Sequence, residues 1–502
     1  QYESEKGKYE REFFASNPDH IIVYQMKSTD GELLNFDLSL TRKDNRSGRG
    51  SSFCDGTEVL DGNKIRLYGK QGGNHGIAFE LLVQVRTKNG KISRMGSHLL
   101  VEDAKEATLF ITSRTSFRSE HPLQWCMDVL SNAEKESYGT LQERHIKDYL
   151  SYYEKSNLKL NCKDSYEHLT TPERLEQMRN GIEDIELINT YYNFARYLLI
   201  SSSREGSLPS NLQGIWNEEF EPMWGSKYTI NINIEMNYWI AEKTGLSKLH
   251  MPLLEHLQRM YPHGKDVAEK MYGIDGFCCH HNTDIWGDCA PQDNHVSSTL
   301  WPMGGAWFCL HLIEHYKYTK DREFLKEYYG ILKDAVKFFL QLCVMFGVHW
   351  GFVAISVNNL ATLGYDPITI AGLASAFGQA GVVLMIMLRT KNKKLKSVCG
   401  PAIISAMVGI TEPSIYGVTL QFKKPFMLAC LASGIGGAII GFGGVKQYVY
   451  GTNGIFGWLQ VINPQTGFDS SVLAAIIACA VSFIAAIILM MTVGKDSIPE
   501  SK

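Results

Sequence analysis

Charged side chains are distributed very unevenly along this chain, and that limits what its two ends can fold into. Residues 342–502 hold 10 Lys or Arg and 5 Asp or Glu, about 9% of that stretch. Subtracting these from the totals of 50 and 53 leaves 40 basic and 48 acidic side chains in residues 1–341, about 26%. The net charge of −3 therefore hides two different compositions, one typical of a soluble protein and one typical of a membrane protein. A balance this even argues against a nucleic-acid-binding protein, which would carry a basic stripe.

Residues 1–122 have the pattern of short β-strands. Turn signals such as Asp61-Gly62-Asn63 separate apolar runs that alternate or are rich in β-branched residues. The runs cover residues 21–26, 33–40, 64–68, 77–86 and 107–112. Several short strands at this spacing predict part of a β-sandwich.

Residues 123–341 have the pattern of helices. Residues 123–170 are charged and predict a helical linker, after which Thr171 is the expected N-cap and Pro172 the first helical residue. One apolar stripe is expected to run along the helix that follows: Leu175, Met178, Ile182, Ile185, Ile188 and Leu199. Later helices are expected at 236–244, 249–261, 300–319 and 321–341, joined by loops rich in Trp, Asn and His. Residues 171–341 therefore predict the first part of an α/α toroid.

Residues 342–494 are expected to form α-helical transmembrane structure, followed by a polar tail at 495–502. Val472–Gly494 contains no charged residue over 23 positions, enough at 1.5 Å per residue to cross a hydrocarbon core of about 30 Å. Basic residues cluster at 389–396 and 423–424, which predicts the cytoplasmic side for both clusters.

Two loop regions in the helical part carry residues suited to carbohydrate. Trp216 and Trp224 offer flat apolar faces that can stack on a sugar, and the neighbouring amides can pair with hydroxyl groups. Asn231 and Asn233 would point to the same face if their segment is extended. The alternative is that these Asn and Trp side chains only satisfy buried loops.

The second loop region, residues 279–288, packs His, Asp, Asn and Trp side chains closely together. His280 and His281 are adjacent, so they point apart and form a poor metal-binding pair. Asp284 and Asp288 are candidates for acid or base groups, or for carboxylates that only shape the loop. We expect no metal site and no cofactor.

The strings LPSNLQGIWN, YTININIEMNYW, HHNTDIW and WPMGGAWFCLHLIEHY resemble glycoside hydrolase family 95, the inverting α-L-fucosidases. YEREFFASNPDHIIVY and AKEATLFITSRTSF resemble the β-sandwich of the same family, so the likeness covers residues 1–341. The resemblance implies that Asn231 and Asn233 position and polarise the attacking water. It implies a substrate that is a fucosylated glycan or another small sugar, contacted by Trp216, Trp224, Thr229, His280, His281, Asn282, Asp284 and Trp286.

The family's general acid lies in a Ser-Pro-Glu-Asn context that this sequence does not contain. An inverting glycosidase needs a proton donor opposite its activated water, and that donor typically contributes 10²–10⁴-fold to the rate. Whether the chain is an enzyme is therefore open, and we expect weak hydrolysis or none.

Glu412 is the most informative residue of the membrane-like part. A carboxylate at membrane depth usually faces a cavity and a substrate, and Pro413 fits a broken segment lining that cavity. The alternative is a Glu at the membrane surface. His349 is the second polar candidate, with helix packing as its alternative role.

FGVHWGFVAISVNNLATLGYDP and GITEPSIYGVTLQFKKPF resemble the EIIC permease of phosphotransferase systems, in the β-glucoside branch. The resemblance implies that His349, Asn358 and Glu412 contact a sugar within the cell membrane, here a bacterial inner membrane. It also implies EIIB and EIIA proteins as partners.

The two resemblances meet at residues 341 and 342 without a linker, so we expect a chimeric chain that is incomplete in both parts. A genuine fusion gene is the alternative origin. The predicted function is that of a fucosidase-like hydrolase, without a visible signal peptide, fused to part of a sugar permease. A β-glucoside-type permease component is the alternative, and a membrane-tethered sugar binder is a third possibility.

Overall fold

The computed structural model describes residues 2–4, 7–42, 54–72, 75–160, 166–345 and 351–495. For residues 297–298, 340–345 and 351–354 the structure describes the backbone only. The chain divides into two compact units, Gln1–Phe338 and Phe339–Lys502. We describe each unit separately.

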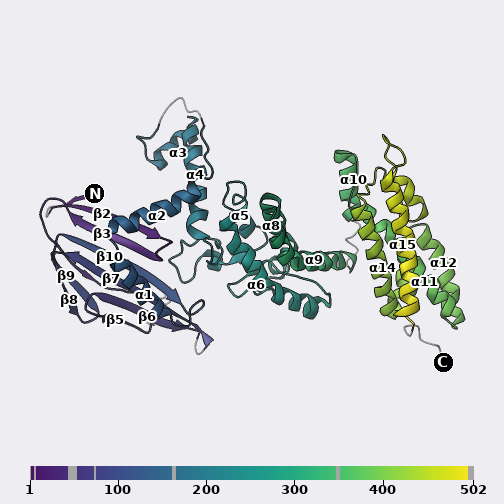
Figure 1. Ribbon diagram of the computed structural model, residues 1–502, viewed down its shortest axis with the longest axis horizontal. Helices are drawn as coiled ribbons and strands as arrows, with labels where there is room; N and C mark the ends of the chain where they lie inside the picture. The colour runs from purple at the N-terminus through teal and green to yellow at the C-terminus, as the bar shows by residue number, and fades with distance from the viewer. Residues whose placement is uncertain are drawn as a thin grey trace. The chain divides into compact units, whose positions relative to one another are not determined.

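The N-terminal unit begins with two antiparallel sheets, which confirms the predicted β-sandwich (Figure 1). Seven strands follow the order β1-β2-β3-β10-β7-β6-β5 and three follow the order β4-β9-β8. Their bounds are β1 Tyr2–Ser4, β2 Gly7–Ser16, β3 Ile21–Ser28, β4 Leu34–Leu38, β5 Gly56–Leu60, β6 Lys64–Gln71, β7 Ile77–Lys88, β8 Lys91–Met95, β9 His98–Ala104 and β10 Glu106–Thr115. Val83 and Val85 of the large sheet and Leu99 and Val101 of the small one are buried together, so the sandwich core lies between them.

Two helices follow the sandwich, α1 (Pro122–Glu134) and α2 (Tyr138–Tyr153). The predicted linker is therefore helical, and its first helix belongs to the sandwich. Cys126 and Leu130 of α1 are buried in one cluster with Val23, Leu82 and Phe110 of the large sheet. Alternation along a strand explains this, since Leu82 faces α1 while its neighbour Val83 faces the other sheet.

The predicted continuous helix from residue 171 is wrong. The structure has α3 (Thr171–Arg179) and α4 (Ile185–Ser202), separated by Gly181 in the left-handed region with φ 89°. Thr170 is the N-cap, not Thr171, and it forms a capping box with Glu173. Asp184 then caps α4 by accepting the Leu187 N–H.

The predicted apolar stripe is broken for the same reason. The turn places the residues of the predicted stripe on two separate helices, so they no longer share one helix face. Four of the six side chains are exposed, namely Leu175, Met178, Ile182 and Ile188. A buried ion pair between Arg174 and Asp184, with Nε–Oδ2 2.7 Å, holds the turn instead.

The remaining helices of this unit surround one core. They are α5 (Asn233–Tyr238), α6 (Ser247–Tyr272), α7 (Val296–Thr299), α8 (Gly304–Thr319) and α9 (Arg322–Met345). Leu253, Leu257, Phe308, Leu312 and Tyr328 are buried in that core. The helix predicted at 236–244 starts earlier and ends at Tyr238, whereas α6 is longer than predicted and α9 continues past residue 341.

The C-terminal unit is helical, as predicted. In the part of this unit that the structure describes, three helical stretches are long and apolar enough to cross a membrane, namely Thr369–Arg389, Lys424–Phe442 and Ser470–Thr492. The helices of the unit are α10 (Gly351–Leu363), α11 (Leu373–Arg389), α12 (Lys393–Met407), α13 (Glu412–Ser414), α14 (Lys424–Phe442) and α15 (Ser470–Thr492). In Figure 1, α11, α12, α14 and α15 form one bundle.

The two basic clusters of this bundle, at 389–396 and 423–424, lie at the same end. Arg389, the last residue of α11, donates from Nη1 to the carbonyl of Met490 near the end of α15, 2.9 Å away. Leu428, one turn into α14, is buried with Met490, so Lys423 and Lys424 belong to the same end. That grouping agrees with the side predicted from the positive-inside rule.

Candidate functional site

A short strand pair brings the two predicted loop regions together. β11 (Tyr228–Thr229) runs antiparallel to β12 (Asn282–Thr283), with Thr229 opposite Asn282. The Ile230 N–H extends the contact by donating to the carbonyl of His281 at 2.6 Å. Two segments more than fifty residues apart in the sequence thus form one site region.

Asn231 and Asn233 do not lie on an extended segment. The chain turns after β11, and Asn233 is the first residue of α5, so the two-residue period that would put both amides on one face does not apply. Asn231 is exposed and Asn233 is half-buried. Their predicted role with a catalytic water stays a prediction.

The loop before β11 is fixed by its own amides. Asn211 Oδ1 accepts the Gln213 N–H at 2.8 Å and the Ser226 hydroxyl at 3.1 Å, and Asn237 of α5 donates to the Asn211 carbonyl at 3.0 Å. Trp216 and Trp224 are exposed, and Trp224 is held at a φ of 59°. The backbone of the loop is therefore held by hydrogen bonds, while the indole side chains of Trp216 and Trp224 are exposed to solvent.

The loop at 279–288 combines buried and exposed candidates. His280 is fully buried, bonds to the Cys289 carbonyl through Nδ1 and to the Tyr272 hydroxyl through Nε2, both at 2.8 Å, and burial lowers its pKa. Asp284 Oδ1 accepts the N–H groups of Trp286 at 2.9 Å and Asp288 at 3.1 Å. These contacts support the loop-shaping alternative for Asp284, and they occupy both ring nitrogens of His280, whose predicted contact with a substrate stays a prediction.

Several buried polar atoms at this site have no hydrogen-bond partner among the described residues. They are Gln213 Oε1, both carboxyl oxygens of Glu235, Asn282 Oδ1 and Thr283 Oγ1. Buried polar groups are normally hydrogen-bonded, so unsatisfied ones near the same strand pair indicate a place for water or a polar ligand.

Glu235 was not among the predicted site residues. It lies two positions after Asn233 on α5, and burial raises its pKa to about 8. The sequence feature that could have identified Glu235 is its position as the one acidic residue in the apolar and amide-rich segment from Ile230 to Trp239.

Trp286 also lines a cavity of about 820 Å³. The other walls come from the sandwich and include Arg42, Gln71, Phe79, Glu80 and Arg114. An aromatic face beside charged and amide groups is suited to a sugar, whose rings present both C–H surfaces and hydroxyl groups. Trp286, 56% exposed, is itself in edge contact with Phe117 at a centroid distance of 6.5 Å.

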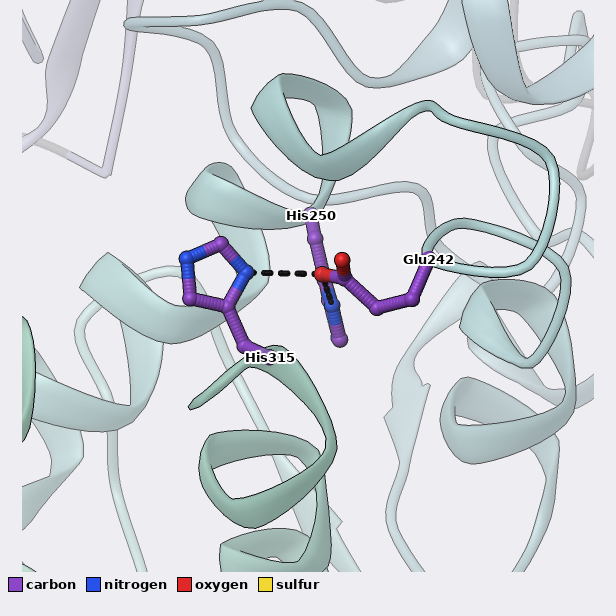
Figure 2. A group of neighbouring side chains, drawn as sticks. All are labelled: Glu242, His250 and His315. Carbon is purple, nitrogen blue, oxygen red and sulfur yellow. Dashed lines mark hydrogen bonds and ion pairs between the residues drawn. The ribbon is translucent and has the colours of Figure 1, made fainter. Parts of the chain in front are cut away.

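A separate buried cluster joins Glu242, His250 and His315 (Figure 2). Glu242 Oε1 lies 2.8 Å from His250 Nδ1 and 2.7 Å from His315 Nδ1. The three side chains come from the turn after α5, from α6 and from α8, and all are buried. Sequence analysis did not predict this cluster, because its members are separated by 8 and 65 positions.

In the C-terminal unit, Glu412 is exposed at the start of α13 and Asn358 is exposed on α10. His349 lies outside the described residues. Asp366 is a buried carboxylate of this unit, which accepts from Asn359 Nδ2 at 2.8 Å and from the Thr369 N–H at 2.9 Å. Asp366 was missed because a lone acidic residue beside a proline resembles an ordinary loop residue.

Comparisons with known protein families match the same division of the chain. Residues 1–120 match the glycosyl hydrolase family 65 N-terminal domain, residues 137–355 the glycosyl hydrolase family 95 catalytic domain, and residues 324–434 the phosphotransferase system EIIC domain. The last two matches overlap across α9, where the predicted join lies.

Individual relatives divide in the same way. The chain is 32% identical over 360 residues to alpha-L-fucosidase 2 of Arabidopsis thaliana, covering 66% of this chain and 43% of that protein. It is 31% identical to the probable alpha-fucosidase A of Aspergillus niger, covering 67% and 44%. It is also 43% identical over 143 residues to the beta-glucoside-specific EIIBCA component of Dickeya chrysanthemi, covering 28% and 22%. The chain thus spans less than half the length of each of these relatives.

Proposed function

Because the chain joins a segment of glycosyl hydrolase family 95 to a segment of a phosphotransferase-system EIIC permease, we propose that its N-terminal unit binds fucosylated glycans. The observation that carries this proposal is the β11–β12 pair, which unites the Asn231–Asn233 segment with the segment ending at Trp286. The unsatisfied polar atoms beside that pair and the cavity lined by Trp286 support a polar ligand with apolar faces.

In this proposal the amides of Asn231 and Asn233 hold a water molecule, and Trp216, Trp224 and Trp286 contact sugar rings. Thr229, His281 and Asn282 frame the base of the site on and beside the strand pair. Glu235 is not assigned as the proton donor, because it is fully buried and a general acid must reach the glycosidic oxygen. The proposed function is therefore sugar binding with little turnover.

We expect the full chain, purified in detergent, to bind 2′-fucosyllactose, and the Trp286→Ala variant to bind it about 5- to 30-fold more weakly. Loss of one stacking indole costs on the order of 1–2 kcal/mol, and each 1.4 kcal/mol is tenfold in affinity. Isothermal titration calorimetry measures the difference. Tyr329→Ala is the matched control, since Tyr329 is an equally exposed aromatic residue on α9. Equal affinity in all three proteins contradicts the proposed site.

Fucose release by the same full chain is expected to be at least about 10²-fold slower than by a complete family member. The physical reason is the missing proton donor, whose contribution is typically 10²–10⁴-fold. A coupled assay of free fucose from 2′-fucosyllactose tests this. A rate near that of the complete enzyme would mean that another group of this chain supplies the proton.

For the C-terminal unit we infer association with a bacterial inner membrane and a sugar contact at Glu412, with His349 and Asn358 as further candidates. The three apolar helices and the basic end of the bundle support the membrane association. EIIB and EIIA proteins are the proposed partners, because an EIIC domain depends on them for sugar phosphorylation. This part adds to the fucosidase-like function and does not replace it.

A further inference from the structure

We propose that Glu242, His250 and His315 form a binding site for one divalent transition-metal ion, with Zn²⁺ as the ion whose ligand preferences match best. Two imidazole nitrogens and one carboxylate oxygen are a donor set that zinc uses in proteins. The site lies inside the helical core of the N-terminal unit and is independent of the proposed sugar site.

The distances are close to those of a metal centre. The three donor atoms lie within 4.8 Å of one another, and Glu242 Oε1 is 2.7–2.8 Å from each Nδ1. Donor atoms in a tetrahedral zinc site with bonds of about 2.0–2.1 Å lie roughly 3.3 Å apart. Each Nδ1–Oε1 distance would therefore lengthen by about half an ångström when a metal ion binds.

The surrounding residues support the ligand orientation. Ser247 Oγ donates to the other carboxylate oxygen, Oε2, at 2.5 Å, and fixes the plane of the Glu242 carboxylate. His250 Nε2 lies 3.0 Å from His311 Nδ1, so the ring has a partner on the side away from the site. Metal-binding histidines usually have such a partner for their second ring nitrogen.

The hydrogen-bond contacts also suit a metal, because both Nδ1 atoms already face the same carboxylate oxygen. Without metal each Nδ1–H donates to Oε1. With metal the proton of each ring resides on Nε2, and for His250 that proton is donated to His311.

The charge balance gives a reason for a cation here. Glu242 is a buried carboxylate, and among the described residues its ion-pair partners are His250 and His315, which as metal ligands would both be neutral. A buried charge without compensation is costly. A divalent ion with hydroxide as its fourth ligand makes the cluster neutral overall.

A metal at this position would tie α5, α6 and α8 together beneath the loop that leads into the sugar site. The His250 ring stacks on Tyr238 at a centroid distance of 5.6 Å. The Tyr238 hydroxyl in turn accepts the N–H of Ser210, next to Asn211. The expected role is therefore structural support.

The test uses the full chain, stripped with a chelator and then titrated with Co²⁺ and Zn²⁺. We expect one bound ion per chain by elemental analysis, the visible absorption of tetrahedral Co²⁺, and a rise in the melting temperature with Zn²⁺. Glu242→Gln and His315→Gln are expected to weaken metal binding more than about 100-fold. His311→Gln is expected to weaken it less, by about 10-fold or more, because it acts through His250.

His256→Gln is the control, a substitution of another buried histidine outside the cluster, and it should bind metal as the unmodified chain does. If Glu242→Gln does not fold, the Co²⁺ spectrum of the unmodified chain still tests the proposal. The positions of its absorption bands show whether the ligands are nitrogen and oxygen atoms. Absence of stoichiometric metal, or a Co²⁺ spectrum that His315→Gln leaves unchanged, overturns the proposal.

Discussion

Replacing Arg196 by leucine is expected to reduce the stability of the α2–α4 region by about 2–4 kcal/mol. Arg196 is fully buried on α4, and its guanidinium donates to the carbonyls of Tyr152 at 3.0 Å, Tyr153 at 2.7 Å and Ser156 at 2.7 Å. The Tyr152 and Tyr153 carbonyls belong to the last turn of α2, and the Ser156 carbonyl follows that turn. The leucine variant removes the charged donor from all three part-buried acceptors, which is the costly way to lose a hydrogen bond.

Hydrogen exchange of peptides from residues 138–202 in the full chain measures this effect, because the chain has two units and a single melting temperature would mix them. Arg179→Leu is the control. Arg179 is an exposed arginine of α3, paired only with Glu176 in the adjacent turn, and such pairs contribute less than about 1 kcal/mol. Equal losses of protection in the two variants would contradict a special role for Arg196.

Glu235→Gln is expected to stabilise the N-terminal unit, and to do so more strongly as pH rises. Burial raises the pKa of Glu235 from the ordinary 4.5 to about 8, so the unfolded chain releases this proton at lower pH than the folded chain. Between these values the unmodified protein loses about 1.4 kcal/mol of stability per pH unit relative to the glutamine variant. The advantage of Gln is absent below about pH 4.5, grows to several kcal/mol, and levels off above about pH 8.

Hydrogen exchange of peptides from α5 and α6 in the full chain, at a series of pH values, measures that difference. Glu269→Gln, at an exposed position of α6, serves as the control and should show no such slope. A stability difference between Glu235→Gln and the unmodified chain that does not change with pH would mean that another group neutralises the Glu235 carboxylate.

The sequence predicted the class of each part because local patterns carry that information. Alternation in residues 77–86 placed β7, and the uncharged run at 472–494 placed α15, each to within a few residues. The sharp fall in charged residues after position 341 located the division between a soluble fold and a membrane-like bundle. Hydrophobic period and charge density are properties of neighbouring residues, so they can be read without a structure.

Local patterns failed where a turn or a distant partner decided the outcome. The stripe from Leu175 to Leu199 had a helical period, yet Gly181 and the Arg174–Asp184 pair divided it into two helices. The segment of Asn231 and Asn233 was compatible with a strand, but β11 ends at Thr229, where its partner β12 is also only two residues long.

The sequence by itself thus determined the fold classes, the membrane-like helices and the residue types suited to a sugar. Only the tertiary structure decided that Thr229 pairs with Asn282, that the Glu235 carboxylate is buried with no hydrogen-bond partner among the described residues, and that Glu242, His250 and His315 meet at hydrogen-bonding distance. The physical reason is that burial and pairing depend on contacts between residues far apart in the chain, and a single sequence carries no record of which distant residues come together.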